Sequence, residues 1–145
     1  MMKRFSMLLC ILLLSCTAYA ENSTKAGGYT IHHNALTTDT LSPKVANAYG
    51  IQRSKNRGMV NISVIKDNPG TTGTPVTADV KLAARNLLGQ ERDLPLREIR
   101  EETAVYYITD FPVGHREQLV FKIEVLPAGS GYPLAARFQQ EFFTD

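Results

Sequence analysis

Gln118-Leu119-Val120-Phe121-Lys122-Ile123-Glu124-Val125 is the stretch of sequence that decides the fold. Apolar side chains recur along it at every second position, and Gln118, Lys122 and Glu124 alternate with them. Successive side chains of a β-strand point to opposite faces, whereas a helix gathers apolar residues at every third or fourth position. The stretch therefore predicts a strand whose buried face carries Leu119, Phe121, Ile123 and Val125.

The same period of two recurs on both sides of this stretch. Val60, Ile62 and Val64 alternate with polar residues, and so do Val80 and Leu82 farther along. Glycine, proline, asparagine and aspartate separate these runs, as expected for turns. The fourth predicted strand contains Pro95 and is therefore placed at a sheet edge. The predicted strands are Tyr29–Leu36, Gly58–Lys66, Ala78–Leu88, Leu94–Ile99, Thr103–Thr109, Gln118–Val125 and Leu134–Phe142.

One short helix is predicted between the first two strands. Ser42 followed by Pro43 is typical of a helix N-cap and first helical position, and Gly50 is a typical residue at a helix end. Seven strands with turns between them and one short helix predict an all-β fold, a two-sheet antiparallel sandwich of the immunoglobulin or fibronectin type. The pattern leaves the strand order open, so a barrel is the alternative.

The first 20 residues have the features of a cleavable export signal. Lys3 and Arg4 precede an apolar run, and Ala18-Tyr19-Ala20 offers small side chains for cleavage before Glu21. The apolar run is about half the roughly 20 residues that a membrane-spanning helix needs, and no later segment is apolar enough to span a bilayer. We therefore expect a periplasmic protein without a transmembrane segment.

A second type of cleavage is also compatible with this end of the sequence. Leu13-Leu14-Ser15-Cys16 resembles a lipobox, which would make the protein a lipoprotein anchored through Cys16. With cleavage after residue 20, we expect residues 21–28 to form a flexible leader and residues 29–145 to form a single sandwich domain.

The composition of the exported part excludes several classes of function. Both cysteines, Cys10 and Cys16, lie in the signal, which leaves no disulfide, thiolate nucleophile or cysteine metal ligand. Lys3 and Arg4 leave with the signal, so 14 basic and 14 acidic residues remain. A formally neutral domain has no overall field that would draw it to nucleic acid, which is therefore not an expected partner.

Histidines are the only residues that suggest a metal site. His32 and His33 are neighbours on a predicted strand, where they point to opposite faces, so one ion could use only one of them together with His115 or Met59. Catalytic contexts such as Gly-x-Ser-x-Gly and Ser-x-x-Lys are absent from the sequence. We expect no enzyme, no resident metal and no cofactor.

Six segments of the sequence carry a resemblance to a known family: Tyr29–Leu36, Ala48–Ser54, Asn61–Val64, Ala84–Gln90, Tyr106–Ile108 and Phe138–Gln140. Together they resemble a family of small exported bacterial proteins, domain of unknown function 4426, over nearly the whole exported part. That family has no assigned activity, so the resemblance implies a secreted single-domain sandwich without known catalytic residues. It also singles out polar residues as candidates for binding: His32, Arg53, Ser54, Asn86 and Gln90.

Two of these candidates have an alternative role. Asn86 and Gln90 flank Leu87-Leu88-Gly89, so they could make hydrogen bonds within a turn instead of binding a ligand. We expect the protein to be a non-enzymatic periplasmic binding or accessory module that contacts a protein, a peptide or an envelope component. The alternatives are a periplasmic metal-binding protein that uses the histidines, and an envelope hydrolase for which the sequence offers no recognisable nucleophile.

Overall fold

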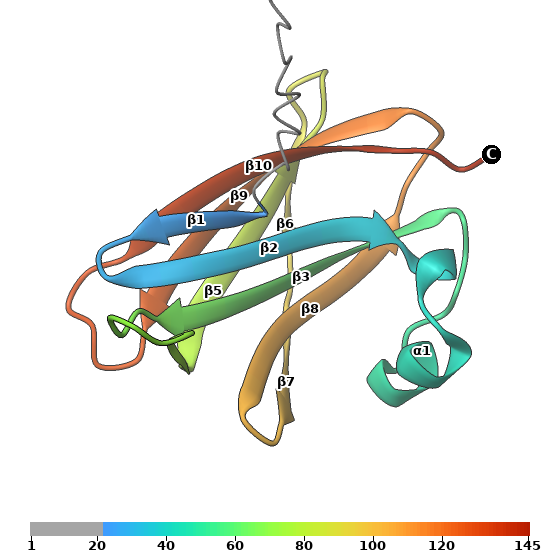
Figure 1. Cartoon of the computed structure of the whole chain (residues 1–145). Helices are drawn as coiled ribbons and strands as arrows, with labels where there is room; N and C mark the ends of the chain where they lie inside the picture. Colours follow the sequence, from blue (N-terminus) through green and yellow to red (C-terminus); the bar gives the residue numbers. More distant parts are fainter. Residues whose placement is uncertain (1–21) are drawn as a thin grey trace, which may run out of the picture.

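Two antiparallel β-sheets packed face to face form the chain from residue 22 to residue 145, the part that the computed structural model describes (Figure 1). The strands of the larger sheet are β1 (Ser23–Ala26), β2 (Tyr29–Thr37), β3 (Arg57–Lys66), β4 (Thr74–Pro75), β7 (Arg97–Glu101) and β8 (Ala104–Pro112). Those of the smaller sheet are β5 (Ala78–Arg85), β6 (Glu91–Leu94), β9 (Glu117–Pro127) and β10 (Leu134–Phe142). The predicted all-β sandwich is confirmed, and the predicted signal and Cys16 lie outside the described residues.

The strand order, which the sequence left open, follows from the pairing. The larger sheet has the order β1-β2-β3-β8-β7, with β4 added beside β3, and the smaller sheet has the order β10-β9-β5-β6. All pairs are antiparallel. Each sheet ends in unpaired edges within the described chain, so the barrel alternative does not form.

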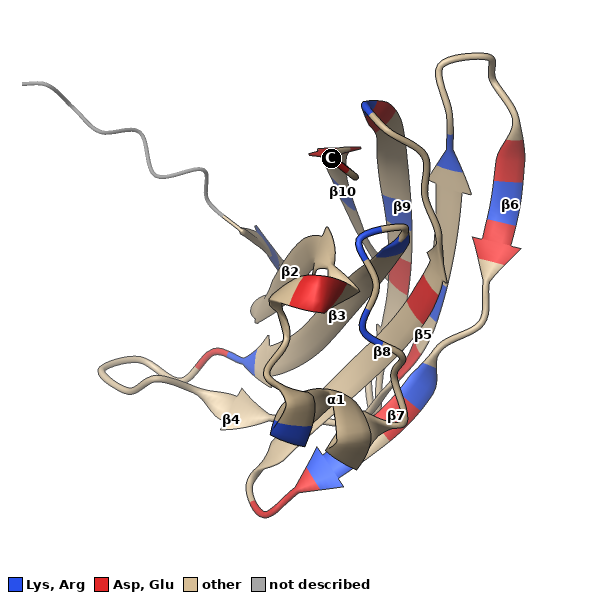
Figure 2. Cartoon of the chain, turned by 90° about the vertical axis from the view of Figure 1, so that its right-hand side faces the viewer, with Lys and Arg blue, Asp and Glu red and all other residues tan. Residues whose placement is uncertain are grey.

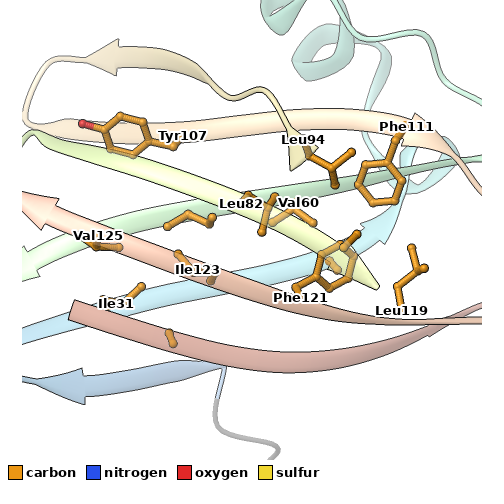
Figure 3. Packing of buried hydrophobic residues seen from close by; sticks show 14 of the residues in the cluster. Ile31, Val60, Leu82, Leu94, Tyr107, Phe111, Leu119, Phe121, Ile123 and Val125 are labelled. Carbon is orange, nitrogen blue, oxygen red and sulfur yellow. The ribbon is translucent and has the colours of Figure 1, made fainter. Parts of the chain in front are cut away.

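The core lies between the two sheets, and β9 supplies much of it. Leu119, Phe121, Ile123 and Val125 are buried, as their alternation predicts, and they face residues such as Val60 of the larger sheet (Figure 3). The ring of Phe121 stacks on that of Phe138, with their centroids 4.8 Å apart. Aromatic rings bury large apolar areas, which makes this group a main source of stability.

Tyr107 of β8 ties the two sheets together by hydrogen bonds. Its buried hydroxyl accepts a hydrogen bond from the backbone N–H of Ala78 at 2.8 Å and donates one to Glu98 Oε1 at 2.9 Å. Burial raises the pKa of Tyr107, so the hydroxyl keeps the proton that it donates. The start of β5 is thereby fixed against the larger sheet.

Helix α1 (Pro43–Tyr49) has the bounds that the sequence predicts. The Ser42 hydroxyl accepts a hydrogen bond from the N–H of Val45 at 3.2 Å, and Gly50 ends the helix with φ +66°. A short 3₁₀ turn, η1 (Thr38–Thr40), precedes the helix. This segment covers part of the outer face of the larger sheet, where a second apolar cluster contains Ile51, Met59 and Ile108.

Two sequence predictions about strands are wrong. The single edge strand expected at Leu94–Ile99 is two strands in different sheets, because Leu94 pairs with Leu82 and Arg97 pairs with Ile108. The intervening Pro95 lacks the N–H that a continuous ladder would need. The strand expected to reach Leu88 ends at Arg85, where a turn begins.

The segment expected as a flexible leader also differs from its prediction. Ser23–Ala26 forms β1, which pairs with the first half of β2 through a turn at Gly27 and Gly28. Both glycines have positive φ, as the commonest two-residue hairpin turn requires. Within residues 22–145 no helix is long and apolar enough to cross a membrane.

Candidate functional site

A hollow of about 890 Å³ lies on the outer face of the smaller sheet. All of its lining comes from β5, β6, β9 and β10 and from the residues that flank β6 and β10, with no contribution from the larger sheet. Leu82 and Ile123 turn their side chains into the core, so the hollow opens on the opposite, solvent-facing side of these strands. Ala83 and Ala135 are the small residues of this outer side, and their short side chains leave the space.

Charged side chains of both signs surround the hollow. Figure 2 shows basic and acidic bands on β5, β6 and β9. The lining holds three basic and three acidic residues: Lys81, Lys122, Arg137, Glu91, Asp93 and Glu124. A site with this balance suits a ligand that itself carries both signs, and it does not suit a polyanion such as nucleic acid.

The strand register places two cations side by side in the hollow. Arg137 of β10 stands directly opposite Lys122 of β9. Like charges in directly opposed positions are unfavourable, and Lys122 Nζ instead contacts Glu91 Oε2 at 3.3 Å. Arg137, Asp93 and the opposed residues Lys81 and Glu124 form no ion pair in the described chain, so these charges are available to a ligand.

His32, the first predicted binding residue, lies on the outer face of the larger sheet. It is exposed on β2, opposite Ser23 of β1 and Ser63 of β3. The hollow lies on the outer face of the other sheet, so His32 does not belong to it.

Arg53 and Ser54 hold the connection between β2 and β3 together. The Arg53 guanidinium donates to the backbone oxygens of Leu41 at 2.7 Å and Asp39 at 2.9 Å. The buried hydroxyl of Thr38 donates to the Ser54 backbone oxygen at 3.1 Å and accepts from the Ser54 N–H at 2.9 Å. The Arg53 side chain and the Ser54 backbone thereby position η1 and α1, while the Ser54 hydroxyl accepts a hydrogen bond from the Asn56 N–H at 3.1 Å.

Asn86 and Gln90 form the turn that joins β5 to β6. Asn86 Oδ1 accepts from the N–H groups of Leu88 and Gln90, both at 3.0 Å, and Asn86 Nδ2 donates to Gln90 Oε1 at 2.8 Å. The two side chains also line a recess of about 260 Å³ that includes Glu117. Their turn role matches the alternative that the sequence offered, and the five predicted binding residues lie in three separate places.

The histidines do not converge on a metal site. His33 points into the core, whereas Met59 belongs to the apolar cluster on the outer face of the same sheet. His115 lies in the turn before β9, where its ring contacts Asp145 Oδ2 at 3.3 Å and accepts from the Thr144 N–H at 3.2 Å. Across residues 22–145 no group of three or more His, Cys, Asp or Glu residues could hold a metal ion.

His33 is a buried, uncharged part of the core. Its side chain is 5% exposed, its ring stacks on Phe138 with centroids 4.5 Å apart, and its Nε2 pairs with the Thr24 hydroxyl at 3.2 Å. The other ring nitrogen, Nδ1, is buried without a hydrogen-bond partner. Burial, together with the nearby charge of His32, lowers the pKa of His33 and favours the neutral ring.

Sequence reasoning missed the hollow because its lining comes from strands far apart in the chain. Ala83 pairs with Lys122, and Lys122 pairs with Arg137, so three distant positions form one row across the sheet. A local signal was nevertheless present: Ala83 and Ala135 stand at outward positions of strands whose other outward residues are charged or amide side chains.

The family model described as "Domain of unknown function (DUF4426)" matches residues 23–145. The chain belongs to the DUF4426 family. A crystal structure of a DUF4426 family protein from Pseudomonas aeruginosa PAO1 is 33% identical in sequence, with a TM-score of 0.72. That match covers 88% of this chain and 99% of the other. No curated protein matches the chain.

Other structural neighbours of this DUF4426 protein share the fold at low sequence identity. FetP from uropathogenic E. coli strain F11 matches with 9% identity and a TM-score of 0.60, covering 83% of this chain and 92% of the other. A copper-bound variant of FetP matches with 9% identity and a TM-score of 0.55, covering 85% and 90%. Identities this low establish a common sandwich architecture.

Proposed function

We propose that this DUF4426 protein is an exported, non-enzymatic binding module of the periplasm, and that it holds a segment of a partner polypeptide in the hollow of its smaller sheet. The observation that carries the proposal is the hollow of about 890 Å³ itself, with small residues at Ala83 and Ala135 between charged side chains. Ligand sites of proteins are commonly concave and of this volume.

The charges of the hollow favour a polypeptide over other ligands. Arg137 offers a planar guanidinium to a carboxylate, while Asp93 and Glu124 offer carboxylates to lysine or arginine side chains. A polypeptide segment can carry both kinds of charged group, and its apolar side chains can pack against Ala83 and Ala135. A nucleic acid or an anionic polysaccharide carries negative charge only. Charge pairs at such a site set specificity and association rate more than affinity.

Site-specific photo-crosslinking tests this proposal in cells of the native host. A photo-reactive amino acid replaces Ala135, which is exposed in the hollow, and in a matched control it replaces His32, which is exposed on the outer face of the other sheet. We expect a discrete protein adduct from position 135 and none from position 32. The adduct should disappear when Ala83→Arg fills the hollow in a protein whose circular dichroism spectrum is unchanged.

Three outcomes would contradict the proposal. An adduct that survives Ala83→Arg would place the contact outside the hollow. Adducts from position 32 alone would move the site to the larger sheet. A non-protein adduct, such as an envelope saccharide, would refute the polypeptide assignment.

Metal binding is the second candidate function, favoured by the copper-bound FetP variant that shares the fold. This chain would have to use its own histidines, of which His33 is buried in the core and His115 interacts with the C-terminal residues. We therefore expect copper(II) or zinc(II) to leave the melting temperature unchanged. A ligand present at a hundredfold excess over its dissociation constant would stabilise the protein by about 2.7 kcal/mol, an effect that His115→Ala should abolish if His115 is a ligand.

A further inference from the structure

The turn between β5 and β6 presents two leucines to solvent. Leu87 is 75% exposed and Leu88 is 85% exposed, the highest values among the large hydrophobic residues of the described chain. Turn tips usually carry Gly, Pro, Asn, Asp or Ser, whose conformations or hydrogen bonds suit a turn. Figure 1 shows this turn projecting beyond the strands, at the top of the view. Neither burial in the core nor turn geometry therefore accounts for leucine at these two positions.

Four of the five backbone N–H groups from Asn86 to Gln90 donate hydrogen bonds within this turn, and the exception is that of Leu87. The N–H groups of Leu88 and Gln90 donate to Asn86 Oδ1, that of Asn86 donates to the Gln90 oxygen at 3.0 Å, and that of Gly89 donates to the Asn86 oxygen at 3.1 Å. A polar group that loses water without gaining a partner is costly in an apolar medium. Because four of its five donors are already paired, this turn can approach such a medium at a lower cost than a turn whose donors all rely on water.

A guanidinium lies at the base of the same turn. Arg85 is exposed, and its Nη2 would be 3.4 Å from a Cβ built on Gly89, which places the cation against the residue that follows Leu88. Gly89 has φ +80°, so the turn itself needs glycine there. Two apolar side chains with an adjacent cation match the boundary between acyl chains and anionic headgroups.

We propose that the Leu87–Leu88 tip docks the protein on an anionic lipid bilayer, with the leucines at the level of the acyl chains and Arg85 at the headgroups. A protein socket fits less well, because a specific interface buries about 800 Å² on each partner and this tip offers only two apolar residues between polar ones. A bilayer requires no complementary shape. The contact is weak and reversible, since the exported part has no net charge to strengthen it.

Tryptophan fluorescence tests this docking directly, because the chain contains no tryptophan. Leu88→Trp places one reporter at the tip. Tyr132→Trp is the matched control, since Tyr132 is 63% exposed in the connection between β9 and β10, at the opposite end of the strands. Both proteins are titrated with phosphatidylglycerol vesicles and, separately, with phosphatidylcholine vesicles. We expect a blue shift for Leu88→Trp with phosphatidylglycerol alone, and none for Tyr132→Trp.

Vesicle sedimentation of the chain with its natural tip provides the second measurement. Leu87→Gln/Leu88→Gln should reduce the fraction bound to phosphatidylglycerol vesicles at least severalfold, and Arg85→Gln should reduce the preference for phosphatidylglycerol over phosphatidylcholine. These glutamine variants keep the backbone hydrogen bonds of the turn, so their circular dichroism should match that of the parent protein. The proposal would be overturned if the parent and the double variant sedimented equally, or if neither kind of vesicle bound the protein. Equal fluorescence shifts for tryptophan at positions 88 and 132 would also overturn it.

Discussion

The two sheets differ in what lies on their outer faces. On the larger sheet, Met59 and Ile108 stand at outward positions and are buried under the connection that contains α1 and Ile51. On the smaller sheet the outward positions carry Lys81, Lys122 and similar residues, and no element covers them in the described chain. Two large apolar residues that are outward and buried thus mark a face that the chain covers itself, whereas the outward Leu126 of the smaller sheet is 40% exposed. A charged outward residue marks a face that is left for solvent or a partner.

The core between the two sheets is the reference for this comparison. We expect the largest change in the free energy of unfolding from a substitution there. Phe121 is fully buried and contacts Phe138, Phe111 and Phe142. Phe121→Ala should lower the free energy of unfolding by about 3 to 5 kcal/mol, because the lost contacts leave a cavity between the sheets. Urea denaturation measures this change, and a loss below about 1 kcal/mol would mean that the ring is not in the core.

The outer face of the larger sheet should behave as a second, smaller core. Met59 is 3% exposed, but it also lines a cavity of about 220 Å³ beside α1, so part of its surroundings is already empty. We expect Met59→Ala to cost about 2 kcal/mol, the lower end of the range for buried methionine. If Met59→Ala left the free energy of unfolding unchanged, the contacts between the α1 segment and the larger sheet would not stabilise the fold. The two outer faces would then not differ in the way described.

The sequence predicts features that depend on neighbouring residues. Ser42, Pro43 and Gly50 fix the helix bounds because capping is local chemistry. β1 could also have been predicted, since Gly27-Gly28 is a typical hairpin turn between two short strands. The hollow and the burial of Ile108 under Ile51 could not be predicted in this way, because they depend on pairings between distant strands and on where α1 packs.

His32 and His33 are neighbours on β2 and lie on opposite faces of the larger sheet, so the pH dependence of stability compares an exposed histidine with a buried one. The lowered pKa of His33 means that the unfolded chain, with a pKa near 6.5, binds a proton more readily than the fold does. The stability that the neutral ring contributes is therefore full above about pH 6.5 and is lost as the pH falls below that value toward the folded pKa.

Denaturation between neutral and mildly acidic pH measures this contribution. His33→Phe keeps an aromatic ring against Phe138 and removes the titration, so its stability should depend less on pH in this window than that of the parent. His32→Gln removes only the exposed neighbour and should retain most of the dependence. Identical pH profiles for the parent and His33→Phe would show that His33 is not a buried neutral ring.

The smallest effect is expected on the open face of the smaller sheet, at the opposed residues Lys81 and Glu124. Their side chains are exposed and form no ion pair within 4.0 Å among the described residues. Lys81→Gln, Glu124→Gln and the double variant should each change the free energy of unfolding by less than about 0.5 kcal/mol, with a coupling near zero, as is usual for exposed charges. A coupling of about 1 kcal/mol would show that these charges stabilise the sheet. A coupling near zero, beside a real cost for Met59→Ala, would mean that the stability of the fold does not depend on these charges, so that they serve solvation or recognition of a partner at the hollow.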